Sequence, residues 1–319
     1  MNAADGEVRV VLDQVYSQAG GAAQLADLYL PSAGEALLPV VIWLHGGGWR
    51  FGDRKLAPDL ALFARRSELA VASIDYRLSD EANFPAPVED VKTAVRWVRS
   101  VAGEFGLDPA RIALWGSSAG AHLAACAALS SEQLFASEEH DGYSSTVQAI
   151  VDGYGPIDFA RIDADRAAMQ SAPTDAESAL VGKLLAAGHP DSFESRLLGR
   201  PVSTSPEQVK AANPIHFVHE ADIPFLILHG EADTLIPWQQ SRLLFDALDS
   251  VGEDATLVLF EKLSHGFFNN PQLAEEDYGS VTVHRTLTRR SSRARWTSNQ
   301  QEGIPAMVES FLRAHLSSR

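Results

Sequence analysis

A short turn between an apolar strand and an alanine-rich helix most constrains what this chain can fold into. Segment 111–125 reads Arg-Ile-Ala-Leu-Trp-Gly-Ser-Ser-Ala-Gly-Ala-His-Leu-Ala-Ala, with the pattern Gly-x-Ser-x-Gly centred on Ser118. Such a turn holds its serine in a strained conformation, with the hydroxyl exposed above a sheet. Glycines fit at 116 and 120 because side chains there would collide with the neighbouring strand or helix. The helix that follows, starting near Ala119, points free N–H groups at any anion beside Ser118.

The pattern alone is common, since a chance match arises in about one chain in ten of this length. The apolar strand before it and the helix after it make it more specific. A Gly/Ser turn without chemistry therefore stays an alternative until partners for Ser118 are found.

Strand and helix patterns alternate along the rest of the chain. Apolar runs typical of strands buried on both faces occur at 39–44, 70–75, 111–115, 146–152, 223–228 and 255–260. Helical patterns occur at 57–68, 88–105, 239–251 and 304–316. Residues 7–15 and 23–30 predict an antiparallel hairpin at a sheet edge. We therefore expect one α/β domain over 1–319, with a mostly parallel central sheet flanked by helices.

Two segments interrupt this alternation. Residues 155–222 mix short helical pieces with Ala, Ser, Pro and Asp, and predict a small cap-like insertion over the top edge of the sheet. Residues 270–303, before the last helix, form an Arg-rich insertion that carries Arg285, Arg289, Arg290, Arg293 and Arg295. A basic cluster can bind nucleic acid, but on a strongly acidic chain we expect a mobile, solvated loop.

The net charge and the cysteine content limit which binding partners and which cellular compartment we expect. The 42 acidic and 26 basic residues leave a net charge of -16, which argues against nucleic acid or an anionic membrane as the main partner. Cys126 is the single cysteine, so no intrachain disulfide can form, and we expect a buried, inert thiol. The start of the chain lacks a signal-peptide pattern, and no apolar run is long enough to span a bilayer. We therefore expect a cytoplasmic protein.

A serine is a poor nucleophile at neutral pH and needs a base, which in turn needs an orienting carboxylate. In a fold of this kind the parts follow in the order Ser, Asp or Glu, His, each in a loop after a strand. The strand at 223–228 leads to Asp233, and the strand at 255–260 leads to His265. Ser118, Asp233 and His265 are therefore our catalytic candidates.

Other side chains compete for these two roles. Glu231 lies earlier in the same turn as Asp233, whereas Asp222 precedes the strand and would lie at the opposite edge. His216 and His219 also precede that strand, and we expect His229, beside a glycine at the strand end, to be packed.

Gly46, Gly47 and Gly48 follow the buried strand at 39–44 and leave backbone N–H groups unobstructed by side chains. The N–H groups of Gly47, Gly48 and Ala119 would form an oxyanion hole, and we expect His45 to orient this loop. The run lacks the endings of phosphate- and dinucleotide-binding loops. Cys and His do not cluster at metal-ligand spacing, so we expect neither metal nor cofactor.

These motifs together resemble the α/β-hydrolase superfamily, and within it the carboxylesterases of the hormone-sensitive-lipase type, close to the acetyl and feruloyl esterases. The similar stretches are 45–49, 75–78, 84–90, 115–124, 229–233 and 265–267, with 195–199 and 213–215 in the cap segment. The resemblance implies a serine esterase that needs no cofactor, with the triad Ser118, Asp233 and His265. Segment 270–303 departs from it, being longer than such esterases usually have there.

We therefore expect a serine carboxylesterase that hydrolyses short-chain or small aromatic esters through an acyl-enzyme, with Trp49 and Phe267 contacting the substrate. An arylformamidase or amidase with the same triad is one alternative. A non-catalytic ligand receptor on the same fold is another, although such receptors usually lack a triad residue. A small ester is the expected partner; nucleic acid and membrane are not, and a homodimer is left open.

Overall fold

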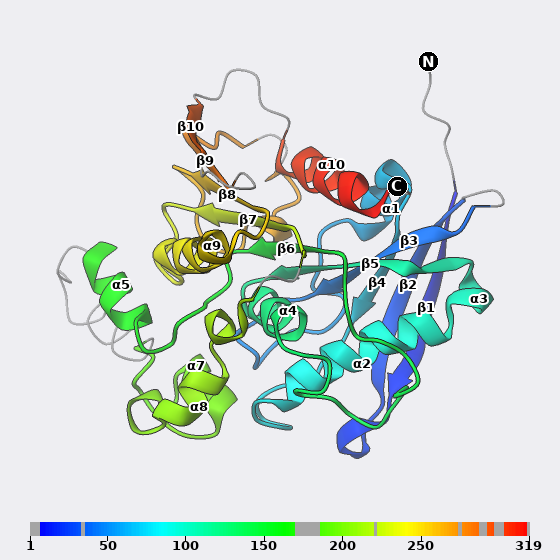
Figure 1. The fold of residues 1–319 in the computed structure, drawn as a ribbon, viewed down its shortest axis with the longest axis horizontal. Coiled ribbons are helices and arrows are strands. Elements are labelled where there is room, and N and C mark those ends of the chain that lie inside the picture. The colour runs from blue at the N-terminus through cyan, green and yellow to red at the C-terminus, as the bar shows by residue number, and fades with distance from the viewer. Residues whose placement is uncertain are drawn as a thin grey trace.

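The computed structural model describes residues 7–32, 36–169, 186–219, 222–273, 276–286, 292–296 and 303–317. A ten-stranded sheet in the order β1-β2-β4-β3-β5-β6-β7-β8-β9-β10 forms the centre of the molecule (Figure 1). The strands are β1 Val8–Ser17, β2 Gln24–Pro31, β3 Leu38–Leu44, β4 Ala70–Ile74, β5 Leu107–Ser117, β6 Ala149–Gly153, β7 Phe225–Gly230, β8 Ala255–Phe260, β9 Val281–Arg285 and β10 Ser292–Trp296.

The six strands from β4 to β8 in this order pair in parallel, and the strands outside them pair antiparallel. β1 and β2 form the predicted hairpin, joined by the 3-10 turn η1 Ala19–Gly21. The chain runs from β3 to β4 on one side and then crosses to β5 on the other. The strand order thus reverses beside β3, where loops at the carboxyl ends of parallel strands diverge and leave room for a site.

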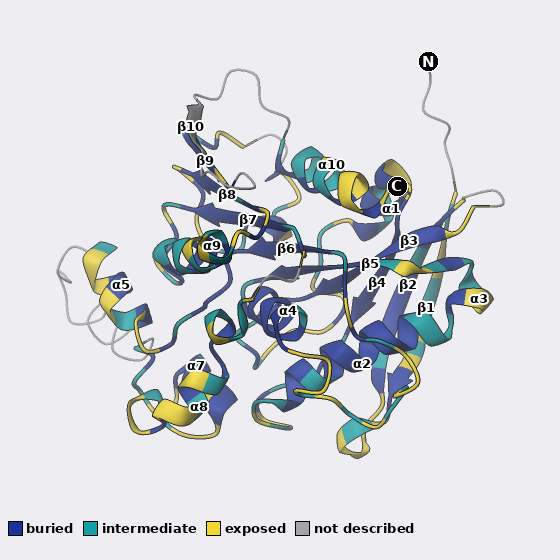
Figure 2. Ribbon diagram, in the orientation of Figure 1, coloured by how far each residue is buried: buried dark blue, intermediate teal, exposed yellow. Residues whose placement is uncertain are grey.

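Alternate residues of the strands face two separate cores. In β3, Ile42 belongs to the core under α2, α4 and α9, whereas Val41 and Trp43 belong to the core under α1 and α10. Figure 1 shows these two sets of helices on opposite sides of the sheet, and Figure 2 shows the central strands buried. The helices are α1 Leu60–Ser67, α2 Ala86–Ser100, α3 Ala102–Phe105, α4 Ala119–Leu129, α9 Gln239–Val251 and α10 Ile304–Leu316.

The predicted helix 88–105 is two helices in the structure. α2 begins two residues earlier than predicted, because Pro87 sits in the first turn, where its missing N–H costs nothing. Val101, with φ −100° and ψ 6°, separates α2 from α3, and Gly106 ends α3 in the left-handed region. The predicted strand 223–228 starts only at Phe225, after Pro224, which has no N–H to donate.

Short helices fill much of the segment between β6 and β7. They lie together at one side of the sheet in Figure 1, and α7 begins at the cap residue Ser192, whose hydroxyl accepts the Ser195 N–H at 3.0 Å. These elements are α5 Ile162–Met169, α7 Phe193–Leu198, η2 Val202–Thr204, α8 Pro206–Ala211 and η3 Pro214–Phe217.

The prediction of a solvated loop for 270–303 is wrong for two stretches. β9 pairs antiparallel with β8, and β10 pairs antiparallel with β9, so both extend the sheet. Val281 is buried in β9 while Arg285 at its end is exposed. Residues 281–284 are all buried, and a strand of only five residues leaves little signal in the sequence. Arg289 and Arg290 lie outside the described residues.

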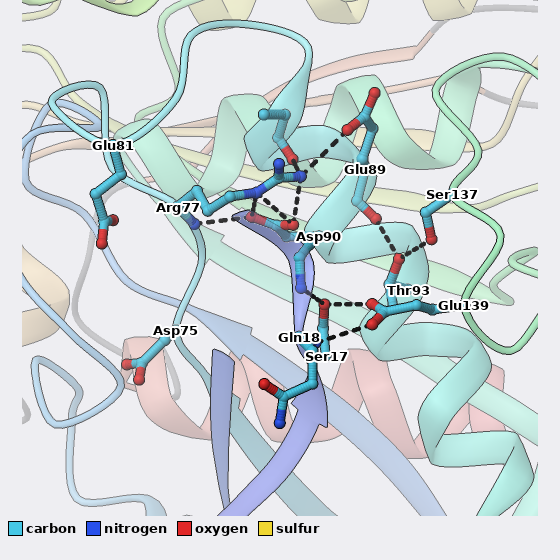
Figure 3. A network of polar contacts seen from close by, with 12 residues as sticks. Ser17, Gln18, Asp75, Arg77, Glu81, Glu89, Asp90, Thr93, Ser137 and Glu139 are labelled. Atoms are coloured by element: carbon cyan, nitrogen blue, oxygen red, sulfur yellow. Dashed lines mark hydrogen bonds and ion pairs between the residues drawn. The ribbon is translucent and has the colours of Figure 1, made fainter. Parts of the chain in front are cut away.

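A buried ion pair ties the loop after β4 to helix α2 (Figure 3). Arg77 donates from Nε to both carboxylate oxygens of Asp90, at 2.9 Å each, and its main-chain N–H donates to Asp90 Oδ2 at 2.8 Å. Asp90 is 1% exposed; burial raises the pKa of its carboxyl, and the contacts with Arg77 oppose that shift. Arg77 of the motif at 75–78 thus has a structural role here, which is to anchor the loop after β4 to helix α2.

Candidate active site

The turn after β5 has the geometry that its glycines predict. Ser118 has φ 51° and ψ −117° and directly precedes α4. A Cβ on Gly116 would lie 2.4 Å from the Gly120 carbonyl carbon, and one on Gly120 would lie 2.2 Å from the Leu44 carbonyl oxygen. Only glycine fits at both positions, and the close packing holds the half-buried Ser118 in its strained conformation.

The structure brings Ser118, His265 and Asp233 into one hydrogen-bonded chain. Nε2 of His265 is 2.9 Å from Oγ of Ser118, and Nδ1 is 2.7 Å from Oδ2 of Asp233. The three residues follow β5, β8 and β7, whose carboxyl ends meet at one edge of the sheet because the strands are parallel.

Asp233 is fully buried and its carboxylate is saturated with donors. Oδ1 accepts the N–H groups of Leu235 and Ile236, both at 2.9 Å. Burial by itself would raise the pKa of Asp233, but hydrogen bonds from His229 and His265 outweigh it and hold the pKa well below its usual range. The carboxylate is therefore ionised at neutral pH and can orient the His265 ring.

The rival residues occupy other places. Glu231 donates its main-chain N–H to the Phe260 carbonyl at the end of β8, and Asp222 lies before β7, at the opposite edge. His216 and His219 are exposed. His229 is packed as expected, although it also approaches Asp233.

The glycine loop after β3 faces Ser118 across the site. Gly47 and Gly48 have φ values of 108° and 61°, and a Cβ on Gly47 would lie 2.1 Å from the Phe51 carbonyl oxygen. Within the described residues, neither N–H group has a hydrogen-bond acceptor. Buried His45 opens this loop and stacks on Tyr76, consistent with an orienting role.

A pocket of about 190 Å³ is lined by the glycine loop, Ser118 and His265. Trp49 lines it and packs edge-on against Phe159. Phe267 is placed differently from the prediction: it is 5% exposed and packs against Tyr154 and Phe260 in the core, away from the pocket wall. The described lining is Gly47, Gly48, Trp49, Phe51, Ser118, Ala119, Pro156, Arg166, Phe193, Glu194, Leu235, Ile236 and His265.

Two charged residues of this lining were not predicted from the sequence. Glu194 of α7 is 2% exposed, and its Oε1 lies 3.4 Å from Arg166 of α5. Burial raises the pKa of Glu194, and Arg166 opposes the shift. Arg166 also donates from Nε to the Leu235 carbonyl at 2.8 Å, which links the cap segment to the turn that carries Asp233. One hint of a role for Glu194 was present in the sequence, where it directly precedes the stretch 195–199 that resembles the acetyl and feruloyl esterases.

In the part of the chain that the structure describes, no three His, Cys, Asp or Glu side chains gather so that they could hold a metal ion. None of its helices has the length and apolar character needed to cross a membrane. Cys126 is buried in α4, with its sulfur 3.5 Å from Nε2 of His122, and burial raises the pKa of its thiol.

A mostly parallel sheet between two layers of helices, with a strained serine on a strand-to-helix turn, defines the α/β-hydrolase fold. The chain belongs to the BD-FAE family, a hormone-sensitive-lipase-like esterase family, whose model matches residues 26–248. The resemblance found in the sequence is thus confirmed at the level of the family.

Individual relatives are esterases by name. Esterase LipQ of Mycobacterium tuberculosis is 32% identical over 216 residues, covering 67% of this chain and 46% of LipQ. Esterase LipC of the same organism is 32% identical over 232 residues, covering 72% of this chain and 53% of LipC. The chain thus spans about half the length of these curated relatives.

Solved structures with similar folds cover more of both chains. A truncated carbohydrate esterase from gut microbiota has 30% identity and a TM-score of 0.65, covering 81% of this chain and 89% of that one. An esterase of Thermogutta terrifontis, solved with propionate bound, has 27% identity and a TM-score of 0.60, covering 84% and 87%.

Proposed function

We propose that this protein is a serine carboxylesterase that hydrolyses short-chain or small aromatic esters through an acyl-enzyme. The hydrogen-bonded chain Ser118–His265–Asp233, beside the N–H groups of Gly47 and Gly48, is the observation that carries the proposal. A nucleophile within reach of a base, and a base held by a third group, is the arrangement that nucleophilic catalysis requires.

In the proposed reaction, His265 Nε2 takes the proton of Ser118 as Oγ attacks the ester carbonyl carbon. The N–H groups of Gly47, Gly48 and Ala119 stabilise the oxyanion that forms. The tetrahedral intermediate collapses, and His265 returns the proton to the departing alcohol. Water then attacks the acyl-enzyme by the same route, releasing the carboxylic acid and restoring the Ser118 hydroxyl.

The pocket supports a preference for small acyl groups. Its volume of about 190 Å³ is below the range usual for drug-sized ligands. Most of the described lining is apolar or backbone, so a short alkyl or small aromatic acyl group fits its chemistry. The propionate bound to the Thermogutta terrifontis esterase agrees in size with this preference.

Hydrolysis of 4-nitrophenyl acetate, butyrate and octanoate tests the proposal. We expect the two short esters to be turned over faster than the octanoate, and Ser118→Ala to lower kcat by about a millionfold. Ser117→Ala is the matched control, since it changes the neighbouring serine of the same turn and should keep the activity. Activity retained by Ser118→Ala would contradict the proposed nucleophile.

Adding an N-formyl arylamine as a substrate separates the esterase from the two alternatives that share this fold, an arylformamidase and a ligand receptor. A rate on an N-formyl arylamine above that on the matched aryl ester would identify an arylformamidase instead. A wild type that is inert on every ester and on the formamide would favour a ligand receptor.

A further inference from the structure

Asp233 lies between two imidazole rings. Oδ2 of Asp233 is 2.7 Å from Nδ1 of His265 and 3.3 Å from Nε2 of His229. His229 lies near the end of β7, four residues before Asp233, and both side chains are 0% exposed. Ser118 completes the chain on the pocket side, whereas the His229 side lies wholly inside the protein.

The contacts of His229 decide which nitrogen carries its hydrogen. Nε2 faces Asp233 Oδ2 and also the Ile236 carbonyl oxygen at 2.8 Å, and both are acceptors only. Nε2 must therefore be the donor. Nδ1 lies 2.7 Å from the hydroxyl of Ser241 on α9, which can donate to the bare nitrogen of the neutral ring. Ser241 is fully buried, so no bulk water competes for this bond.

The carboxylate of Asp233 is held on both oxygens. Leu235 and Ile236 donate N–H bonds to Oδ1, and His265 donates to Oδ2. The Nε2–H of His229 has the Ile236 carbonyl oxygen as its nearer acceptor, at 2.8 Å, and makes a longer contact of 3.3 Å with Oδ2. One N–H can be shared between two acceptors in this way, so His229 adds a second, weaker contact to Oδ2 beside the bond from His265.

Asp152 and Tyr154 are further titratable residues close to this cluster. Asp152, at the end of β6, is buried and interacts electrostatically with His229. Tyr154 packs edge-on against His265, with ring centroids 4.9 Å apart, and lies 6.4 Å from the His229 ring. Burial raises the pKa of Tyr154, so its hydroxyl stays neutral over the working range. Asp152 is therefore the additional group to control for.

We propose that His229, held by Ser241, is a positioning residue for the catalytic base: it donates to Asp233 Oδ2 and so fixes both the direction and the charge that Asp233 presents to His265. The inference rests on the proposed function, in which His265 is the base. Because an N–H donor offsets part of the carboxylate charge, its removal should make protonated His265 more stable.

Three variants test the role of His229. His229→Phe removes the donor, and we expect kcat/KM to fall by about 10- to 100-fold, the loss typical of an outer hydrogen-bond partner. The acidic limb of its pH profile should move to higher pH, by about one unit. His229→Gln keeps an amide donor, so its kcat/KM and the pH of its acidic limb should both stay close to those of the wild type. Ser241→Ala removes only the group that orients His229 and should move the limb in the same direction, by less.

Structural damage alone would lower the folded fraction without moving the limb, so each profile is paired with an unfolding curve. Asp152→Asn serves as the charge control and should not reproduce the shift. A folded His229→Phe whose limb stays at the wild-type pH would overturn the inference. Should His229→Phe not fold, Ser241→Ala decides the question: a limb moved to higher pH would support the positioning role, and a limb at the wild-type pH would overturn it.

A readout without turnover separates this inference from the proposed function. In Ser118→Ala, with or without His229→Phe, ¹⁵N NMR follows protonation of the His265 ring directly. We expect the ring to take up its proton at higher pH in the double variant. An inert wild type would contradict the proposed function alone, whereas identical His265 titrations in the two variants would contradict the positioning role alone.

Discussion

The hydroxyl of Tyr76 donates to the main-chain carbonyl of His45 at 2.9 Å, and their rings stack with centroids 4.3 Å apart. Tyr76 lies in the loop after β4, and His45 opens the glycine loop after β3. Burial lowers the pKa of His45, so the ring stays neutral at neutral pH and stacks without a charge to solvate. This contact links the motif at 75–78 to the loop proposed to bind the oxyanion.

Tyr76→Phe should therefore destabilise the protein. The change leaves the His45 carbonyl buried without its side-chain donor, and we expect a loss of about 1–3 kcal/mol in the free energy of unfolding. Urea unfolding measures it. Tyr143→Phe is the control, since Tyr143 is an exposed tyrosine and its loss of a hydroxyl should change little. Equal stability of Tyr76→Phe and wild type would show that the bond contributes nothing.

Gly47→Ala should reduce catalysis with a smaller effect on folding. The added Cβ would meet the Phe51 carbonyl oxygen at 2.1 Å, at a φ of 108° that alanine disfavours, so the loop must shift. Losing one oxyanion donor costs about 2.7–4 kcal/mol, so we expect kcat to fall by about 100- to 1000-fold. Gly103→Ala, where a Cβ meets nothing within 4 Å, is the control. An unchanged kcat for Gly47→Ala would remove Gly47 from the proposed oxyanion hole.

Asp90→Ala should destabilise strongly. It leaves the largely buried Arg77 guanidinium without its main partner, and breaking a buried pair in this way costs about 3–5 kcal/mol. Asp246→Ala breaks the exposed pair with Arg242 and should cost about 1 kcal/mol or less. Denaturant midpoints of the two variants give the comparison, and a similar loss in both would contradict the structural role of the buried pair.

The raised pKa of Asp152 should make the free energy of unfolding depend on pH. Burial raises the pKa of the Asp152 carboxyl to about 6 in spite of the N–H of Gly155 and the nearby His229, which act in the opposite direction. A carboxyl whose pKa is raised on folding favours the folded state below its unfolded pKa, and that contribution is lost as pH rises through about 6. The shift corresponds to about 3 kcal/mol.

Asp152→Asn should not lose stability in this way as the pH rises, because asparagine does not ionise. We expect the stability of the variant relative to wild type to increase between pH 4 and pH 7, the window set by about 3.9 in the unfolded chain and about 6 in the folded one. Urea unfolding at both pH values measures the change. Parallel stability curves over this range would contradict a raised pKa for Asp152.

Local sequence patterns predicted much of the fold. Apolar runs and helical periodicity predicted the central strands and the flanking helices, with end points wrong by a few residues where prolines such as Pro87 and Pro224 set the boundary. β9 and β10 were missed because each is a five-residue strand in a polar, Arg-rich stretch. Their pairing with β8 and with each other is a long-range event that no short window contains.

The sequence by itself determined that Ser118, Asp233 and His265 would meet, since each follows a strand and parallel strands bring their carboxyl ends to one edge. It also determined the glycine positions, because close backbone approach excludes a Cβ. Only the tertiary structure decided that Phe267 turns into the core, that Glu194 lines the pocket and that His229 shares Asp233 with His265. Those outcomes depend on side-chain packing between elements far apart in the chain, which spacing and periodicity do not encode.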